Sequence, residues 1–258
     1  MECIIFYPKK IYLYYMMKLT TFILLIGLII SCNNNQDRIQ IVEEENLTQK
    51  QIDSVLDEYS FTYSGVVFID SIEKAILPIS TQKSRGGRYS ADSYYADSYP
   101  QYWNLIFYDI KSGKTKLLTD KKTRISEFKT NLREVGPILQ KSVLYEISDT
   151  DFDMDGKLTY SDPEQLFVSD IDGENFIEIS PKNEDLKDYQ IVPNTDKIII
   201  QTLRDTNNDK EFDQKDEVIW YLIDLSKKTK PMEILKENER REIERLYFKQ
   251  WLLKNQKK

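Results

Sequence analysis

The chain contains no histidine and only two cysteines, Cys3 and Cys32, among its 258 residues. The absence of histidine excludes Ser-His-Asp and Cys-His catalysis and zinc sites that use histidine. Neither a G-x-x-x-x-G-K-[ST] nor a G-x-G-x-x-G sequence occurs, so nothing indicates nucleotide binding. Hydrophobic residues make up 40% of the chain and charged residues 31%, which is enough apolar material for the core of one or two domains.

A short apolar run precedes Cys32. Residues 20–30 are mainly hydrophobic, follow Lys18 and are followed by Ser31. The run is shorter than the about 20 apolar residues that a transmembrane helix needs. It resembles a bacterial lipoprotein signal peptide, which implies removal of residues 1–31 and lipidation of Cys32. A plain N-terminal anchor helix is the alternative.

A signal peptide before Cys32 implies a start site, a charge for the mature protein and a location. Residues 1–15 contain Glu2 and several tyrosines, so we expect the true start at Met16 or Met17. Loss of residues 1–31 removes three lysines and one glutamate, a net +2, and changes the net charge from −7 to −9. Such a charge argues against nucleic-acid binding. Asn33 after the cysteine favours the outer membrane of the cell envelope, and residues 32–47 are typical of a flexible tether.

An acidic stretch in the middle of the chain has the spacing of a calcium loop. The sequence DFDMDGKLTYSD (residues 151–162) matches D-x-D-x-D-G-x-[ILV]-x-x-x-[DE], the pattern of an EF-hand-type loop. The pattern presents carboxylates from positions 1, 3, 5 and 12 and a backbone carbonyl from position 7, while Gly156 makes the sharp turn. The predicted Ca²⁺ ligands are Asp151, Asp153, Asp155, the Lys157 carbonyl and Asp162.

A second copy of this pattern follows 54 residues later. Its predicted ligands are Asp205, Asn207, Asp209, Asp213 and Asp216. Lys210 takes the place of the glycine, so we expect a loop that is strained or differently wound and that binds the ion more weakly. For both stretches, a solvated acidic hairpin without metal is the alternative.

Strand patterns repeat three times between residues 61 and 235. Each unit predicts four strands: two joined by a tight turn, a long loop, and two more joined by a tight turn. The predicted first strands are GVVFID, GPILQ and YQIVPN. Asp109, Asp170 and Asp224 hold the same place in the three units, before a hairpin turn. The predicted fold is therefore mainly β, with about three four-stranded antiparallel units.

The repeats resemble those of TolB-type and WD-repeat propellers, with LFVSDIDGENFIEIS (residues 166–180) as the best match. The acidic loops resemble those of integrin-type propellers, in which such loops join strands rather than helices. This resemblance implies that each ion orders the hairpin between the second and third strands of its unit. Three units are fewer than the four to eight blades of a closed propeller, so an incomplete propeller or open stacking is expected.

The remaining segments of the predicted domain, residues 48–258, are less regular. The T-x-x-Q sequence at Thr48 predicts a capped amphipathic helix over residues 48–58 whose apolar stripe faces the core. Residues 241–253 fit either a helix or a strand, and the repeat favours a strand. The long loop of the first unit is rich in aromatic side chains that could contact a protein or glycan. Those residues are Tyr89, Tyr94, Tyr95, Tyr99, Tyr102 and Trp103.

Together these observations predict a lipid-anchored envelope protein with a calcium-binding β-repeat module that binds a protein or glycan, and no enzymatic activity. One alternative is a structural envelope component with no specific ligand. Another is a hydrolase that uses paired carboxylates.

Overall fold

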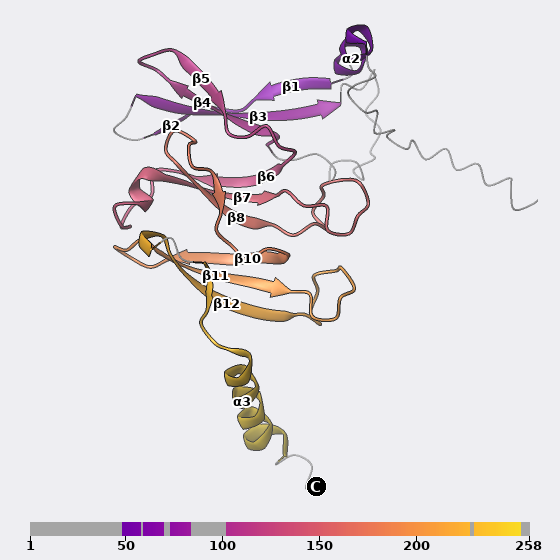
Figure 1. The fold of residues 1–258 in the computed structure, drawn as a ribbon, viewed down its shortest axis with the longest axis vertical. Helices are drawn as coiled ribbons and strands as arrows, with labels where there is room; N and C mark the ends of the chain where they lie inside the picture. Colours follow the sequence, from indigo (N-terminus) through magenta and orange to yellow (C-terminus); the bar gives the residue numbers. More distant parts are fainter. Residues whose placement is uncertain (1–47, 58, 70–72, 84–101, 228–229, 254–258) are drawn as a thin grey trace, which may run out of the picture. The chain divides into compact units, whose positions relative to one another are not determined.

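A computed structural model describes residues 48–57, 59–69, 73–83, 102–227 and 230–253. The chain divides into two compact units, Met1–Ile52 and Asp53–Lys258. Of the first unit only residues 48–52 are described, and all the described strands belong to the second. The fold is mainly β, as predicted, because thirteen described strands pair into three antiparallel sheets (Figure 1).

We name the three sheets A, B and C in chain order; sheets B and C are meanders of consecutive strands, whereas in sheet A both β1 and β2 pair with β3. Sheet A holds β1 (Tyr59–Tyr63), β2 (Val67–Ile69), β3 (Lys74–Lys83), β4 (Asn104–Asp109) and β5 (Lys114–Leu117). Sheet B holds β6 (Arg124–Lys129), β7 (Ser142–Ser148), β8 (Gln165–Asp170) and β9 (Ile177–Glu178). Sheet C holds β10 (Glu184–Ile191), β11 (Lys197–Arg204), β12 (Glu217–Asp224) and β13 (Met232–Glu233). Among the described strands, no pairing joins one sheet to another.

The predicted repeat is confirmed. Asp109, Asp170 and Asp224 end β4, β8 and β12, the strands before the last in sheets A, B and C. The two predicted glycine turns adopt left-handed backbone at Gly113 (φ 69°) and Gly173 (φ 74°) and join β4 to β5 and β8 to β9.

The predicted first strand of the second unit is wrong. GPILQ does not pair; its end forms a single turn of 3₁₀ helix, Leu139–Lys141, and β6 takes the edge position instead. The reason lies 58 residues downstream, because the Asp196 carboxylate accepts the amides of Ile138 (2.9 Å) and Leu139 (3.0 Å). A Cβ at Gly136 would lie 2.4 Å from that carboxyl group, so the close approach requires glycine.

Sheet A differs from the others because two short strands share its edge. β1 pairs with residues 79–83 of β3, and β2 pairs with residues 74–76. Between them the Pro78 carbonyl accepts the Ser64 amide (3.0 Å), which shows that Pro78 faces this edge. Proline has no N–H to donate to a neighbour, and the edge strand is interrupted there.

Two buried clusters hold the sheets together. One joins sheets A and B and includes Ile76, Leu105 and Tyr145, and the other joins sheets B and C and includes Leu166, Ile198 and Ile219. Sheet B therefore contributes side chains to both clusters. Its central strand β7 is buried at six of seven positions, which fits the continuous apolar pattern of a strand covered on both faces.

The two helices lie at the ends of the described chain. α2 (Gln49–Leu56) begins as predicted, because the Thr48 amide donates to the Gln51 side chain (2.9 Å). Its apolar stripe does not face the core, however: none of its residues is buried, and Val55 and Leu56 are about half exposed. None of the described helices is long and apolar enough to cross a membrane.

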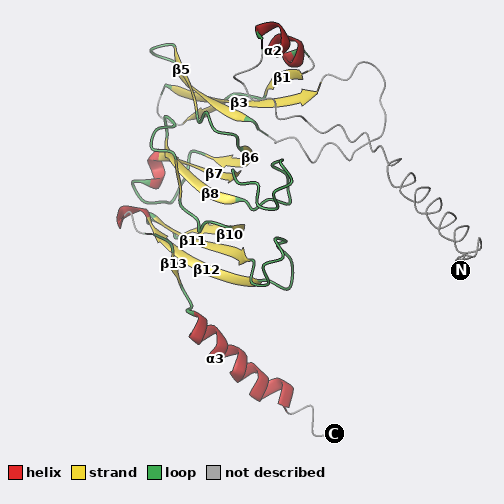
Figure 2. Cartoon of the chain, turned by 45° about the vertical axis from the view of Figure 1, so that its right-hand side comes forward, coloured by secondary structure: helices red, strands yellow, loops and turns green. Residues whose placement is uncertain are grey.

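The strand favoured for residues 241–253 is wrong, because this segment is helical: α3 (Glu237–Tyr247) continues into a π-helical turn, Phe248–Leu252 (Figure 2). The Lys236 amide donates to Glu239 at its start (2.8 Å), and Arg241 pairs with Glu237 one turn away. These local interactions favour a helix over continuation of the repeat.

Candidate metal site

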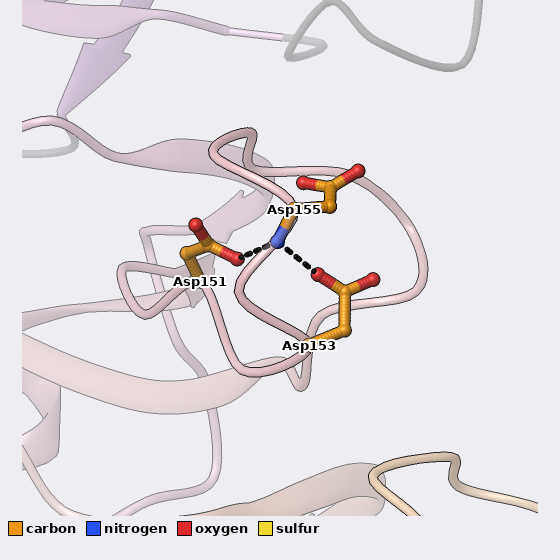
Figure 3. A group of neighbouring side chains, drawn as sticks. All are labelled: Asp151, Asp153 and Asp155. Atoms are coloured by element: carbon orange, nitrogen blue, oxygen red, sulfur yellow. Dashed lines mark hydrogen bonds between the residues drawn. The ribbon is translucent and has the colours of Figure 1, made fainter. Parts of the chain in front are cut away.

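The first acidic loop joins β7 to β8 and brings three carboxylates together. Asp151, Asp153 and Asp155 each offer an oxygen, and these oxygens all lie within 4.8 Å of one another (Figure 3). Three hard oxygens at this separation suit a single divalent cation such as Ca²⁺. The predicted clustering of positions 1, 3 and 5 is therefore what the structure contains.

Backbone amides wind the loop around its own carboxylates. The Asp155 amide donates to Asp151 and Asp153 (both 3.0 Å), and the Gly156 amide donates to the second oxygen of Asp151 (2.8 Å). The chain reverses through positive φ at Met154 (64°) and at Gly156 (86°). Carboxylates held in this way are oriented before any ion arrives.

Asp162 closes the loop at its base. Its two oxygens accept the amides of Phe152 (2.8 Å) and Thr159 (2.7 Å), and its residue exposure is only 2%. Leu158, which holds the aliphatic position of the pattern, is buried. Asp162 therefore ties positions 2 and 9 together through the backbone, and its predicted role as an ion ligand stays a prediction. The Lys157 amide donates to Asp155 (2.8 Å).

Burial and repulsion from neighbouring carboxylates together raise the pKa of Asp153. The donated amide of Asp155 lowers the pKa of Asp153, but burial and the charges of Asp155 and Asp162 outweigh it, and the pKa lies above its usual range. A bound cation would remove this penalty because it favours the charged form of every carboxylate around it.

The second loop joins β11 to β12 and repeats this winding with an offset of 54 residues. The Lys210 amide donates to Asp205 (3.1 Å), and the Asp209 amide donates to Asn207 (2.9 Å). Asp216 accepts the amides of Thr206 (3.0 Å) and Asp213 (3.1 Å), as Asp162 does in the first loop. The expectation of strain is confirmed at Lys210, which has φ 65° where the first loop has glycine.

The second loop differs in charge. Asn207 replaces one carboxylate, and the Lys215 ammonium lies 2.9 Å from Asp213 and 4.0 Å from Asp209. The hydrogen bond from this ammonium lowers the pKa of Asp213. The equivalent of Lys215 in the first loop is Ser161, so only the second loop carries this internal cation. The sequence analysis did not single out Lys215, although a lysine between the predicted ligands Asp213 and Asp216 indicates a charge that competes with the ion.

The two loops touch through aromatic rings. Phe152, from position 2 of the first loop, packs against Phe212, from position 8 of the second, with ring centroids 5.0 Å apart. The contact places the two predicted sites on the same side of sheets B and C, where Figure 1 shows the two long hairpin loops together.

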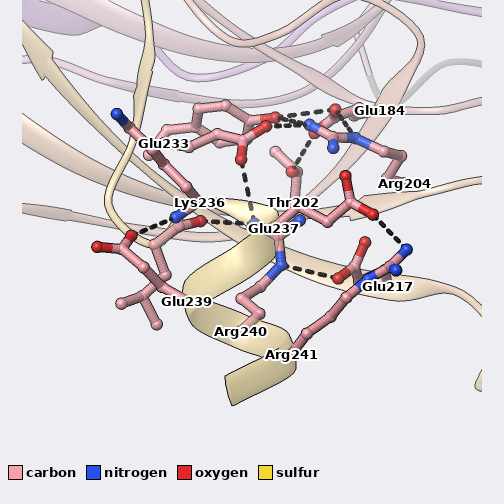
Figure 4. Close-up of polar contacts among 12 residues, drawn as sticks. Glu184, Thr202, Arg204, Glu217, Glu233, Lys236, Glu237, Glu239, Arg240 and Arg241 are labelled. Atoms are coloured by element: carbon pink, nitrogen blue, oxygen red, sulfur yellow. Dashed lines mark hydrogen bonds and ion pairs between the residues drawn. The ribbon is translucent and has the colours of Figure 1, made fainter. Parts of the chain in front are cut away.

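A polar network beside the second loop also escaped sequence reasoning. The buried carboxylate of Glu184 on β10 accepts hydrogen bonds from Thr202 (2.5 Å) and Arg204 (2.6 Å) of β11 and from Tyr221 (2.9 Å) of β12 (Figure 4). Arg204 continues to Glu233 (2.7 Å), and Arg240 of α3 reaches Glu233 from the other side (3.1 Å). This network holds the base of the hairpin and the start of α3 onto sheet C.

The aromatic residues predicted for partner binding are only partly described. Tyr102 forms a bridge with Ile125 and stacks edge-on against Phe128, so much of its ring serves packing. Trp103 is 38% exposed and contacts Phe61. Tyr89, Tyr94, Tyr95 and Tyr99 lie outside the described residues, as does Cys32 with the signal peptide and tether.

An open groove of about 670 Å³ lies beside Tyr102. It is lined mostly by β6 and the residues after it, including Glu127, Lys129 and Asn131. Glu127 is the one carboxylate among the described lining residues, and Glu146 lies opposite it on β7.

Comparison of the chain with protein-family models and with curated proteins finds no match.

Proposed function

We propose that residues 151–162 bind one Ca²⁺ ion that orders the hairpin between β7 and β8. The observation that carries this proposal is the convergence of Asp151, Asp153 and Asp155, whose ligand oxygens lie within 4.8 Å of one another. Exposed acidic groups are common without an ion, but here the backbone amides of residues 155–157 already orient the three carboxylates. Oxygen ligands of this kind are those that Ca²⁺ prefers.

The second loop is proposed as the weaker site. It has the same winding, but Asn207 supplies an amide oxygen, Lys215 already neutralises Asp213, and Lys210 holds positive φ without being glycine. Each difference reduces the gain from a bound cation.

The wider role follows from the rest of the sequence. Lipidation at Cys32 would fix the module to the cell envelope, with the outer membrane favoured by Asn33. The four-stranded meanders support propeller-like blades, although three sheets would leave the propeller incomplete. In this proposal the ordered loops and the aromatic residues near Trp103 present a binding surface for a protein or glycan. A structural envelope component without a specific ligand is the alternative.

A carboxylate-dependent hydrolase receives less support. Glycosidases need two carboxyl groups about 5–9.5 Å apart, facing each other across the substrate. Among the described residues that line the groove, Glu127 is the one carboxylate, and its cross-strand partner Glu146 is not one of them. We therefore propose a binding module rather than an enzyme.

The test is thermal unfolding of the full chain in detergent, with about 1 mM Ca²⁺ or with EGTA. A site with a Kd of about 10⁻⁴ M would add about 1.4 kcal/mol to the free energy of unfolding at that concentration. We expect Asp151→Asn to abolish most of this calcium-dependent gain.

Asp205→Asn is the matched control, because it makes the same change at the equivalent position of the second loop. It should leave most of the gain intact. Equal stability with Ca²⁺ and with EGTA in the unaltered chain would contradict the proposal, and so would a gain lost only in Asp205→Asn.

A further inference from the structure

The end of α3 and the turn that follows it expose an unusual density of large apolar side chains. Six of the eight residues 246–253 are apolar, and the described structure leaves all of them between 43% and 64% exposed. They are Leu246, Tyr247, Phe248, Trp251, Leu252 and Leu253. The first half of α3 is different, because Arg240 binds Glu217 (2.7 Å) and Glu233 and so attaches the helix to sheet C.

The C-terminal end of the chain, which includes this segment, is basic. Residues 245–258 contain five basic residues, Arg245, Lys249, Lys254, Lys257 and Lys258, and no aspartate or glutamate. Since the whole chain has a net charge of −7, this +5 leaves −12 for the other residues. A segment that is both basic and apolar suits a partner whose anionic surface covers an apolar layer.

We propose that residues 245–253 dock on the surface of an anionic lipid bilayer. Aromatic rings flanked by lysines suit the boundary between headgroups and acyl chains, and each basic side chain near an anionic surface adds attraction. Eight residues of helix extend only about 12 Å, far short of the about 30 Å of a bilayer core, so the segment lies in the interface and does not span it. A second copy of the chain fits less well, because self-pairing through residues 245–258 would bring +5 onto +5.

The test follows Trp251 in the full chain. Trp103→Phe and Trp220→Phe leave it as the only tryptophan. The protein is reconstituted into phosphatidylcholine vesicles with brominated acyl chains, with or without phosphatidylglycerol. We expect Trp251 emission to fall at least about twofold when phosphatidylglycerol is present and less in its absence.

Lys249→Glu should raise the phosphatidylglycerol fraction needed for half-maximal quenching at least about twofold. Arg241→Glu is the matched control in the charged half of the same helix and should change it little. The readout is local to Trp251, so it does not depend on lipidation of Cys32 or on calcium.

Three results would overturn the proposal. The first is Trp251 emission that neither lipid composition quenches. The second is quenching that is the same in both compositions and unaffected by Lys249→Glu. The third is an emission shift that depends on protein concentration without lipid quenching, which would assign the face to a second copy.

Discussion

At the scale of single residues, the sixth position separates the two acidic loops. Gly156 and Lys210 have φ values of 86° and 65° in equivalent turns. A left-handed conformation costs a residue with a Cβ roughly 1–2 kcal/mol, whereas glycine adopts it freely. A Cβ added at Gly156 would meet nothing within 4 Å, so the preference for glycine here is conformational and not steric.

Lys210→Gly should therefore stabilise the protein by about 0.5–1 kcal/mol, since the relief of backbone strain exceeds the extra entropy that glycine loses on folding. Gly156→Ala should destabilise it by about 1–2 kcal/mol. Urea unfolding of both variants in EGTA measures these effects without calcium. A destabilising Lys210→Gly would contradict this account of the turn.

Glu146 is the titrating residue that links stability to pH. Burial, and then the charge of Glu127, raise its pKa to about 7, although Lys129 opposes this and Glu164 adds to it. The folded pKa exceeds the unfolded value of about 4.3. The protonated group therefore contributes stability that is fully present below about pH 4.3 and is lost as the pH rises through about 7.

Glu146→Gln should remove this loss. We expect the variant to match the unaltered chain near pH 4 and to exceed its free energy of unfolding at pH 8 by on the order of 1 kcal/mol. Denaturant unfolding at the two pH values measures the difference, with the exposed Glu174→Gln as control. A difference that is the same at both pH values would show that Glu146 does not titrate in this way.

At the scale of elements, the two hairpin loops share one winding but differ in charge. The sequence could predict both loops because their oxygens come from neighbouring residues and the spacing alone determines the turn. It could not predict the turn at residues 139–141, because the cap comes from Asp196 on another sheet. The repeat pattern favoured a strand after residue 241. The segment is a helix instead, because local charge pairs and the lack of glycine and proline favour one.

The charge difference between the two loops can be removed by substitution in the second loop. Asn207→Asp with Lys215→Ser gives the second loop the carboxylate and the serine that the first loop has at those places. We expect the double variant to gain a second calcium-dependent increase in melting temperature, because the added carboxylate repulsion is relieved by the ion.

Calorimetric titration of the double variant should give close to one more Ca²⁺ per chain than the unaltered protein. Lys182→Ser with Lys187→Ser, which removes two lysines outside the loops, controls for the change of −2 in net charge. An unchanged stoichiometry would mean that winding and charge do not determine binding in this loop.

At the scale of the whole molecule, three sheets share two buried clusters, and the acidic loops of sheets B and C meet at Phe152 and Phe212. The sequence predicted the repeat from three aspartates at strand ends, because a strand pattern followed by a turn is local information. It gave no sign of the aromatic contact between the loops, since packing of two solvent-facing loops depends on how their sheets stack.

We propose that calcium orders the first loop much more than the second. The most direct measurement is amide hydrogen exchange of the full chain with Ca²⁺ and with EGTA, compared for peptides that cover residues 149–164 and 205–216. The account predicts that Ca²⁺ slows exchange at least about tenfold in the first peptide and changes the second little. Equal exchange in the first peptide with and without Ca²⁺ would contradict it.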